Sequence, residues 1–316
     1  MFLQSFKLTG LAIAQIVLLG VVGYLLVKRG ILKEEGLNFL SQLVVEAALP
    51  ILIFCQLVKD FSFNIYPNWW IFPLLSLVIT CLGLLTGWLF SFFVKGGQHK
   101  IQFISLIGFQ NAAYVPLVLI SAILPKDQAD TMMVYLFLFL LGFNLVIWSF
   151  GVYMLTFIKA KKFELGSLFS PPVIAIIFSL AFVYFGLAKA IPEFVFKPLK
   201  MIGDCTVPLA IFVVSGNLAQ IKLRHIDKKE VFLVLLAKLI ILPLIAITLA
   251  LKLNLPQLIG ALIVMQVAMP PATSLAVIIR HYKKEDLLIS QGIFFGHILS
   301  LLTTPIFLSL YFSLCK

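Results

Sequence analysis

Ten apolar stretches, each long enough to cross a lipid bilayer as an α-helix, dominate this sequence of 316 residues. Hydrophobic residues make up 62% of the chain and charged residues only 12%, which leaves too little polar surface for a soluble protein of this size. An apolar segment in a bilayer must satisfy its backbone polar groups internally. The sequence therefore predicts an all-α integral membrane protein and excludes a soluble enzyme. The expected spans are residues 6–27, 37–58, 69–94, 101–124, 131–158, 170–188, 194–219, 230–252, 256–279 and 287–314.

The basic residues indicate how the chain is oriented. The connections after the odd-numbered stretches carry 15 Lys and Arg residues, whereas the other connections and the two termini carry 8. Because basic loops stay in the cytoplasm, we expect the N- and C-termini to lie outside it. The net charge of +11 comes from these short, scattered clusters. We therefore expect contact with membrane lipid and no nucleic-acid partner.

The two halves of the chain resemble each other weakly. Each half has five apolar stretches, an odd number, so the second half enters the membrane from the opposite side. The sequence thus predicts two inverted five-helix repeats, residues 1–162 and 163–316, an architecture common in secondary transporters. The aligned residues are Glu46, Pro50 and Phe54 with Asp204, Pro208 and Phe212 at an offset of 158, and Asn111 and Pro116 with Gln266 and Pro271 at an offset of 155.

Prolines beside polar residues predict that the fourth and ninth stretches are broken helices. Proline removes a backbone hydrogen bond and clashes with the preceding turn. A broken helix survives in a bilayer only where protein or a water-filled cavity covers the freed backbone groups, and the half-helix after the break points its positive end at that cavity. A proline kink that only shapes packing is the alternative. The candidate substrate-binding residues are Gln110, Asn111, Tyr114, Pro116, Gln266, Pro270, Pro271 and Thr273.

Three of the charged residues within the apolar stretches are candidate functional residues. Glu46 and Asp204 each precede a proline by four residues. Because an intramembrane acid is costly, each is a candidate to carry a coupling proton or to bind a sodium ion. Hydration at the end of a span, or capping of a neighbouring backbone, is the alternative. Lys238 has three alternative interpretations. It attracts an anionic substrate, it pairs with one of the acids, or its long side chain extends to the cytoplasmic surface.

Four further polar residues are secondary site candidates, and a hydrogen bond between helices explains such residues more often than a ligand does. They are Asn144, Ser215, Asn217 and His297. The chain lacks Gly-rich phosphate-binding motifs and clustered metal ligands, and its four cysteines have neither metal nor disulfide spacing. We therefore expect no cofactor and no bound metal. Energy for transport would come from a gradient of H⁺, Na⁺ or the substrate itself.

These motifs together resemble the auxin efflux carrier family of membrane transporters, including its bacterial permeases. The resemblance covers essentially the whole chain. The sequence differs from the family pattern at Val115, where family members often have glycine. It also lacks the Asn-Pro-Asn crossover and the long cytoplasmic loop of plant members. The absent crossover argues against auxin as substrate. The segments that carry the resemblance are Leu49–Phe54, Asn111–Leu117, Val207–Ala210, Pro270–Ala272, and Lys238 with Pro243.

The resemblance implies a carrier of small organic anions, mono- or dicarboxylates, in a bacterial inner membrane. It implies a fold in which the broken fourth and ninth helices cross, and alternating access around a site at the two breaks. Asn111, Tyr114 and Gln266 would contact the substrate, and Glu46 and Asp204 would couple it to protons. It also implies a possible homodimer.

Three alternatives remain open at this point. The first is a sodium-coupled symporter of the related bile-acid type, with ion ligands from Asn111, Gln266, Thr273 and Ser274. The second is a membrane sensor that binds a ligand without transporting it. The third, a membrane-embedded enzyme, has no supporting element beyond a convergence of the two acids.

Overall fold

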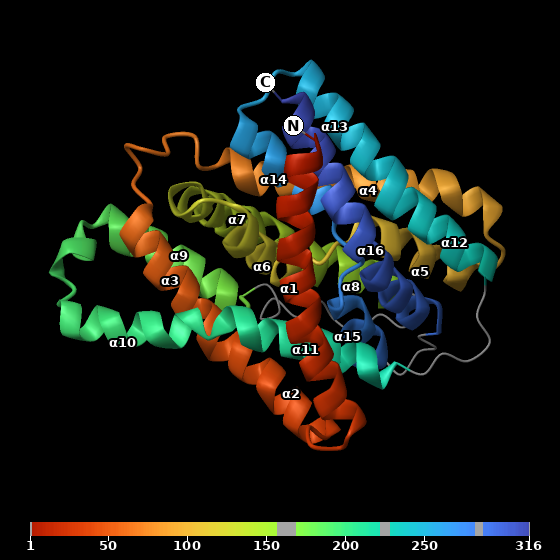
Figure 1. Cartoon of the computed structure of the whole chain (residues 1–316), viewed down its shortest axis with the longest axis horizontal. Coiled ribbons are helices and arrows are strands. Elements are labelled where there is room, and N and C mark those ends of the chain that lie inside the picture. The colour runs from red at the N-terminus through yellow and green to blue at the C-terminus, as the bar shows by residue number, and fades with distance from the viewer. Residues whose placement is uncertain (1, 157–168, 222–227, 282–286, 316) are drawn as a thin grey trace.

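The computed structural model describes residues 2–156, 169–221, 228–281 and 287–315, and every regular element within these ranges is a helix (Figure 1). This confirms the predicted all-helical class for the residues that the structure describes. The helices are α1 (Phe2–Lys28), α2 (Glu34–Leu43), α3 (Leu49–Asp60), α4 (Ile71–Phe90), α5 (Gly97–Gly108), α6 (Tyr114–Ile123), α7 (Lys126–Val146), α8 (Val152–Thr156), α9 (Pro171–Tyr184), α10 (Glu193–Asp204), α11 (Thr206–Gln220), α12 (Lys228–Leu236), α13 (Leu242–Lys252), α14 (Gln257–Ala268), α15 (Ser274–His281) and α16 (Leu287–Leu314).

Seven helical segments among the described residues are long and apolar enough to cross a membrane. They are Thr9–Lys28, Glu34–Asp60, Ile71–Phe93, Lys126–Leu155, Glu193–Gln220, Lys228–Lys252 and Leu287–Leu314. The other three predicted spans differ from continuous long helices. Residues 101–124 and 256–279 each form two short helices with an interruption between them, and residues 170–188 contain the 14-residue α9.

Two prolines, Pro50 and Pro243, each follow a widened helical turn. The π-helical segments Val44–Ala48 and Ala237–Ile241 (η6) immediately precede the helices that begin with Leu49-Pro50 and Leu242-Pro243. Because proline has no N–H, the carbonyl one turn earlier loses its partner, and a π turn lets the ladder continue with longer-range bonds. These segments therefore bend without breaking.

The helices pack as two groups, each drawing on both halves of the sequence. The first group joins α1–α3 to α9–α11, mainly through α1 against α11 and α3 against α9 and α10. The second joins α4–α8 to α12–α16, mainly through α4 against α5 and α7, and α16 against α12 and α14. In Figure 1, α3, α9 and α10 lie on the left, and α4, α5 and α12 lie on the right.

The two groups meet along α1 and α7. α1 packs against α6 and α16 of the second group, and α7 packs against α3 and α9 of the first. Two hydrogen bonds between side chains bridge this boundary. Thr9 and Ser309 share one at 2.8 Å, and Gln56 Nε2 donates one to Asp130 Oδ1 at 3.2 Å.

Large apolar side chains cover the outside of the molecule. Leu3 is 80% exposed, Phe194 77% and Tyr184 72%, and many others exceed a third. Soluble proteins rarely expose contiguous apolar surface on this scale. An outer surface of this kind is suited to lipid tails, in agreement with a multi-pass membrane protein.

Candidate functional site

The two interruptions, residues 109–113 and 269–273, lie directly against each other. The backbone N–H of Asn111 donates to the carbonyl of Pro270 at 2.8 Å, and that of Ala272 donates to the carbonyl of Phe109 at 3.0 Å. These bonds form an antiparallel bridge between Gln110 and Pro271. Each extended segment thus satisfies backbone groups that the other helix break has freed, as a membrane interior requires.

The prolines are placed differently in the two segments. Pro270 and Pro271 lie within the second interruption. Pro116 instead lies in the first turn of α6, where a missing N–H costs nothing, and the extended residues precede it. The first break is therefore upstream of its proline.

Polar side chains reinforce the pairing but leave several polar atoms unpaired. Gln266 is fully buried and donates from Nε2 to the carbonyl of Ala112 at 3.0 Å. Its Oε1, both amide atoms of Gln110 and the hydroxyl of Thr303 are buried without a hydrogen-bond partner. Unpaired buried polar atoms are rare in native proteins and call for an explanation.

A histidine on α16 joins this centre. His297 Nδ1 lies 2.8 Å from the carbonyl of Ile293, so Nδ1 carries a hydrogen and donates it. Nε2 is 3.3 Å from Nδ2 of Asn111. Since an amide nitrogen only donates, Nε2 accepts, and the imidazole is the neutral Nδ1–H tautomer.

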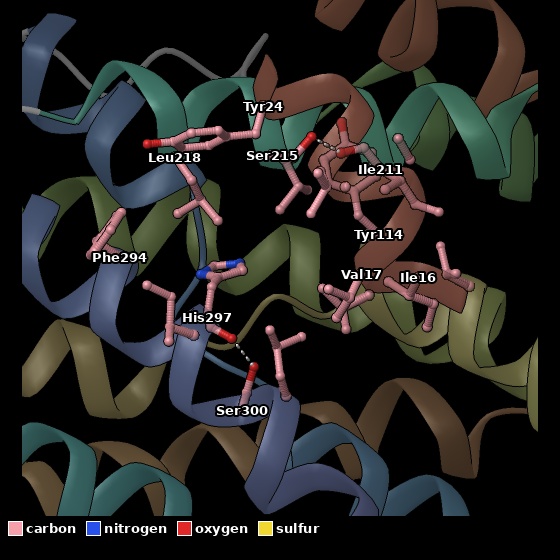
Figure 2. A pocket seen from close by; sticks show the side chains of 18 residues that line it. Ile16, Val17, Tyr24, Tyr114, Ile211, Ser215, Leu218, Phe294, His297 and Ser300 are labelled. Carbon is pink, nitrogen blue, oxygen red and sulfur yellow. Dashed lines mark hydrogen bonds between the residues drawn. The ribbon is translucent and has the colours of Figure 1, made fainter. Parts of the chain in front are cut away.

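A cavity of about 370 Å³ opens beside His297 (Figure 2). This volume lies within the range of about 300–1,000 Å³ typical of small-molecule sites. The cavity lies between the two groups of helices, because α1 and α11 line one side and α6 and α16 the other. Figure 2 shows the imidazole of His297 pointing from α16 into the space between them.

The cavity is largely apolar. Its walls include Ile16, Val17, Ile211, Leu218 and Phe294. The lining residues with polar side chains are Tyr24, Tyr114, Ser215, Ser300 and His297. Tyr24 and Ser300 were not among the predicted site residues. Each lies in an uninterrupted apolar helix, where the sequence gives no signal that distinguishes a cavity-facing residue from a lipid-facing one.

Three predicted site residues, Tyr114, Ser215 and His297, line the cavity. Tyr114 begins α6, so the positive end of that helix faces the cavity. The others lie elsewhere. Gln110, Asn111, Pro270 and Pro271 lie in the paired interruptions, Thr273 ends the second one, and Gln266 lies in α14 next to it; none of these residues lines the cavity.

The three charged candidates do not line the cavity. Glu46 is exposed. Asp204 is 54% exposed and forms an ion pair with Lys200, one helical turn earlier, at 2.6 Å. Lys238 is buried, at 2% exposure, within η6, which packs against α12, α13 and α16. Among the described residues, neither acid forms an ion pair with Lys238.

The remaining candidates have local roles. Asn144 is half-buried and donates from Nδ2 to the carbonyl of Leu140 at 2.9 Å, within its own helix. Asn217 is half-buried on α11 and does not line the cavity. Ser215 combines both roles, since it lines the cavity and donates to the carbonyl of Ile211 at 2.8 Å.

Comparison with known proteins places the chain in a family. A family model described as "Membrane transport protein" matches residues 10–164 and 153–308, which together cover most of the chain. Over 124 residues the chain is 30% identical to the Protein PIN-LIKES 6 of Arabidopsis thaliana, a match that covers 38% of this chain and 29% of that protein. The chain thus aligns with less than a third of that relative's length. Because the family model covers more than half of it, the chain belongs to the membrane transport protein family, an auxin efflux carrier-like family of membrane transporters.

Proposed function

We propose that this protein is a secondary transporter that carries small organic anions, mono- or dicarboxylates, by alternating access. The observation that carries the proposal is the cavity between the two groups of helices, beside the paired interruptions. A site with walls on two separately packed bundles is exposed to one side or the other when one bundle moves against the other. Membership of a membrane transport family supports transport over sensing or catalysis.

The proposed architecture has ten spans, as two inverted five-helix repeats of residues 1–162 and 163–316, with crossing fourth and ninth helices. The two interruptions support it, because they occur at corresponding places in the two halves and pair antiparallel. The family match also falls into two segments of similar length, residues 10–164 and 153–308, which overlap near the proposed boundary. In this account the interrupted helices are α5–α6 and α14–α15.

The cavity lies towards one end of the molecule, which suggests an inward-facing state. It is bounded by the C-terminal parts of α1 and α11 and the N-terminal half of α16, which adjoin the basic connections. The bridging bonds of Thr9 and Gln56 lie towards the opposite ends of their helices. If basic loops are cytoplasmic, the cavity faces inward and these two bonds close the outer side.

The residues that line the cavity favour an apolar monocarboxylate as the substrate. A dicarboxylate would bury two charges in a largely apolar cavity, whereas an apolar monocarboxylate buries one and contacts the aliphatic walls. The positive end of α6 and the phenol of Tyr114 suit the carboxylate. Asn111 and Gln266 would not contact the substrate; they would hold the interruptions in place.

The apolar exterior fits a bilayer. The proposed location is a bacterial inner membrane with both termini outside the cytoplasm, and the proposed assembly is a homodimer.

Filling the cavity tests this proposal. Val17 lines it, and Val17→Trp should occupy it without adding charge. In proteoliposomes loaded at equal protein density, we expect this variant to lose at least nine tenths of the saturable uptake of [¹⁴C]benzoate. The matched control is Val78→Trp on α4, where Val78 is 63% exposed on the outer surface. Full uptake by Val17→Trp would contradict the assignment of this cavity as the substrate site.

Sodium coupling is a second candidate, favoured by the unpaired oxygens at the interruptions. Gln110 Oε1, Gln266 Oε1 and the Thr303 hydroxyl are buried without partners, and such neutral oxygens are ligands suited to a hard cation. Uptake that depends on a sodium gradient at constant pH, and is lost in Gln266→Leu, would favour it. Uptake unaffected by replacing sodium with choline would exclude it.

A further inference from the structure

The cavity presents an anion with an electrostatic problem. Among the described residues that line it, none carries a permanent charge, and most of the wall is aliphatic or aromatic. Removing a lone carboxylate from water into such surroundings is strongly unfavourable unless a positive charge accompanies it. Of the side chains that line the cavity, only the imidazole of His297 can become positive by binding a proton.

The hydrogen-bond partners of His297 suit both of its protonation states. The carbonyl of Ile293 accepts from Nδ1–H in the neutral and in the cationic form. Nε2 faces the carboxamide of Asn111, which donates to it at 3.3 Å in the neutral form. A half-turn of that carboxamide replaces Nδ2 by Oδ1, which then accepts from Nε2–H of the cation. A partner that only donates or only accepts would favour one state.

We propose that His297 is the proton-binding residue of the transport cycle and that it gains its proton when a carboxylate enters the cavity. The inference rests on the proposed function. The proton comes from water in the cavity and binds Nε2, the Asn111 carboxamide turns, and the imidazolium and carboxylate form a pair with no net charge. When the carboxylate leaves, Nε2 returns the proton to water. The substrate and one proton therefore move together, and Asn111 is a positioning residue.

The other titratable groups near the cavity are not placed to bind the transported proton. Tyr24 and Tyr114 also line the cavity, and a tyrosine side chain does not become positive by binding a proton. The sequences of α11 and α14 contain no titratable side chain. Glu230 of α12 lies 3.3 Å from His99 of α5 and is thereby engaged. The other charged or titratable residues on helices packed against α16 are Lys7 and Lys28 of α1, Lys100 of α5, Lys228 and Lys229 of α12, Lys238 of η6, Lys252 of α13, and Arg280 and His281 of α15.

Equilibrium binding of [¹⁴C]benzoate to the purified protein between pH 5.5 and 8.5 tests the linkage. Coupling to one proton predicts that the affinity of the wild type falls about tenfold per pH unit once unliganded His297 is neutral. His297→Gln retains an amide but cannot titrate, so its affinity should be weak and independent of pH. The controls are His99→Gln, which removes a histidine outside the cavity, and Glu46→Gln, which removes an exposed intramembrane acid. Both should retain the slope.

The outcomes separate the two claims. Benzoate binding whose affinity does not change with pH, or whose slope is lost in Glu46→Gln and not in His297→Gln, overturns the inference and leaves the proposed function standing. An absence of binding and flux for benzoate and every other carboxylate in a panel contradicts the proposed function, and the inference falls with it.

A spectroscopic measurement keeps the inference testable if His297→Gln does not fold. The chain has four histidines, and the variant His99→Gln, His225→Gln, His281→Gln retains only His297. With ¹⁵N-labelled histidine at pH 7.5, the imidazole should give the signals of the neutral Nδ1–H tautomer. Saturating benzoate should convert them to those of an imidazolium. A ring that stays neutral with benzoate bound would overturn the inference.

Discussion

Nδ2 of Asn111 donates a hydrogen bond to Nε2 of His297, and this bond joins the first helix interruption to the wall of the cavity. The same interruption is paired through its backbone with the second one, at Pro270 and Ala272. The cavity-facing imidazole is thus fixed to the structural centre of the protein. Its orientation depends on both broken helices being in place.

Replacing Asn111 tests that dependence. Asn111→Leu leaves Nε2 of His297 without a donor, and a buried group left unpaired costs about 1–3 kcal/mol. We expect benzoate flux to fall at least fivefold. Asn111→Asp places a carboxylate beside the imidazole that pairs with the imidazolium in place of the substrate, so benzoate should bind more weakly and with a shallower pH dependence than in the wild type. Initial rates in proteoliposomes and the binding assay above measure the two effects. Equal pH profiles for Asn111→Asp and the wild type would contradict this role.

Gly296 of α16 is the close-contact point between that helix and the second interruption. A Cβ at this position would lie 2.6 Å from Cδ of Pro271, a ring that cannot move aside without shifting the interruption. Gly296→Ala should therefore destabilise the protein by about 1–3 kcal/mol, as overpacking does. Gly10→Ala on α1 is the matched control, because nothing lies within 4 Å of its added Cβ. Thermal unfolding in detergent compares them, and an unchanged Tm for Gly296→Ala would contradict the packing described.

Gln56 tests the proposed outer closure. Its Nε2 bridges Asp60 at 2.7 Å and Asp130 at 3.2 Å, so it ties α3 to α7 across the two groups of helices. Gln56→Leu removes the tie, and a hydrogen bond to a charged group contributes about 1.5–3 kcal/mol. Asp130→Asn, which keeps an acceptor for Gln56, is the conservative comparison.

Thiol labelling from inside reports the conformational populations. In a cysteine-free background, a cysteine replaces Leu218 of the cavity wall. This cysteine should react readily with an impermeant thiol reagent that is trapped in the lumen of right-side-out vesicles. Adding Gln56→Leu should slow this reaction severalfold and speed labelling from outside, whereas Asp130→Asn should have a smaller effect. Faster labelling from outside in the unmodified background would show that the cavity faces outward.

The buried charge of Lys238 should lower the stability of the protein. It is buried at 2% exposure, and the ion pairs recorded among the described residues do not include it. Replacing a buried charge by an apolar chain of similar length is often neutral or stabilising, by about 1–4 kcal/mol. We expect Lys238→Met to raise the Tm. A lower Tm would mean that the ammonium group has a stabilising partner beyond those described.

Much of the fold was predictable from the sequence because bilayers constrain it so strongly. The apolar stretches gave the helices, and the prolines with Gln110, Asn111 and Gln266 identified the region of the interruptions. The exact positions of the two interruptions were harder to predict from the sequence. The first interruption precedes Pro116 by several residues, because a proline in the first turn of α6 is compatible with the helix.

The cavity was not predictable in the same way. Its walls are mainly aliphatic residues of α1, α11 and α16, whose apolar residues do not gather on a single face. Only the packing of the helices shows which face encloses a space. The same limit applies to Glu46 and Asp204, since burial of an intramembrane acid depends on helix rotation, and both turn out to be exposed.

Uptake by proteoliposomes is the most direct test of the central claim, that the cavity carries an organic anion across the membrane. Vesicles with purified protein would be offered [¹⁴C]benzoate or [¹⁴C]malonate under an inward proton gradient, an inward sodium gradient or neither. We predict saturable benzoate uptake that exceeds malonate uptake, is driven by the proton gradient and is lost in Val17→Trp but retained in Val78→Trp. Uptake no greater than in protein-free vesicles, for both anions under all three conditions, would contradict the account.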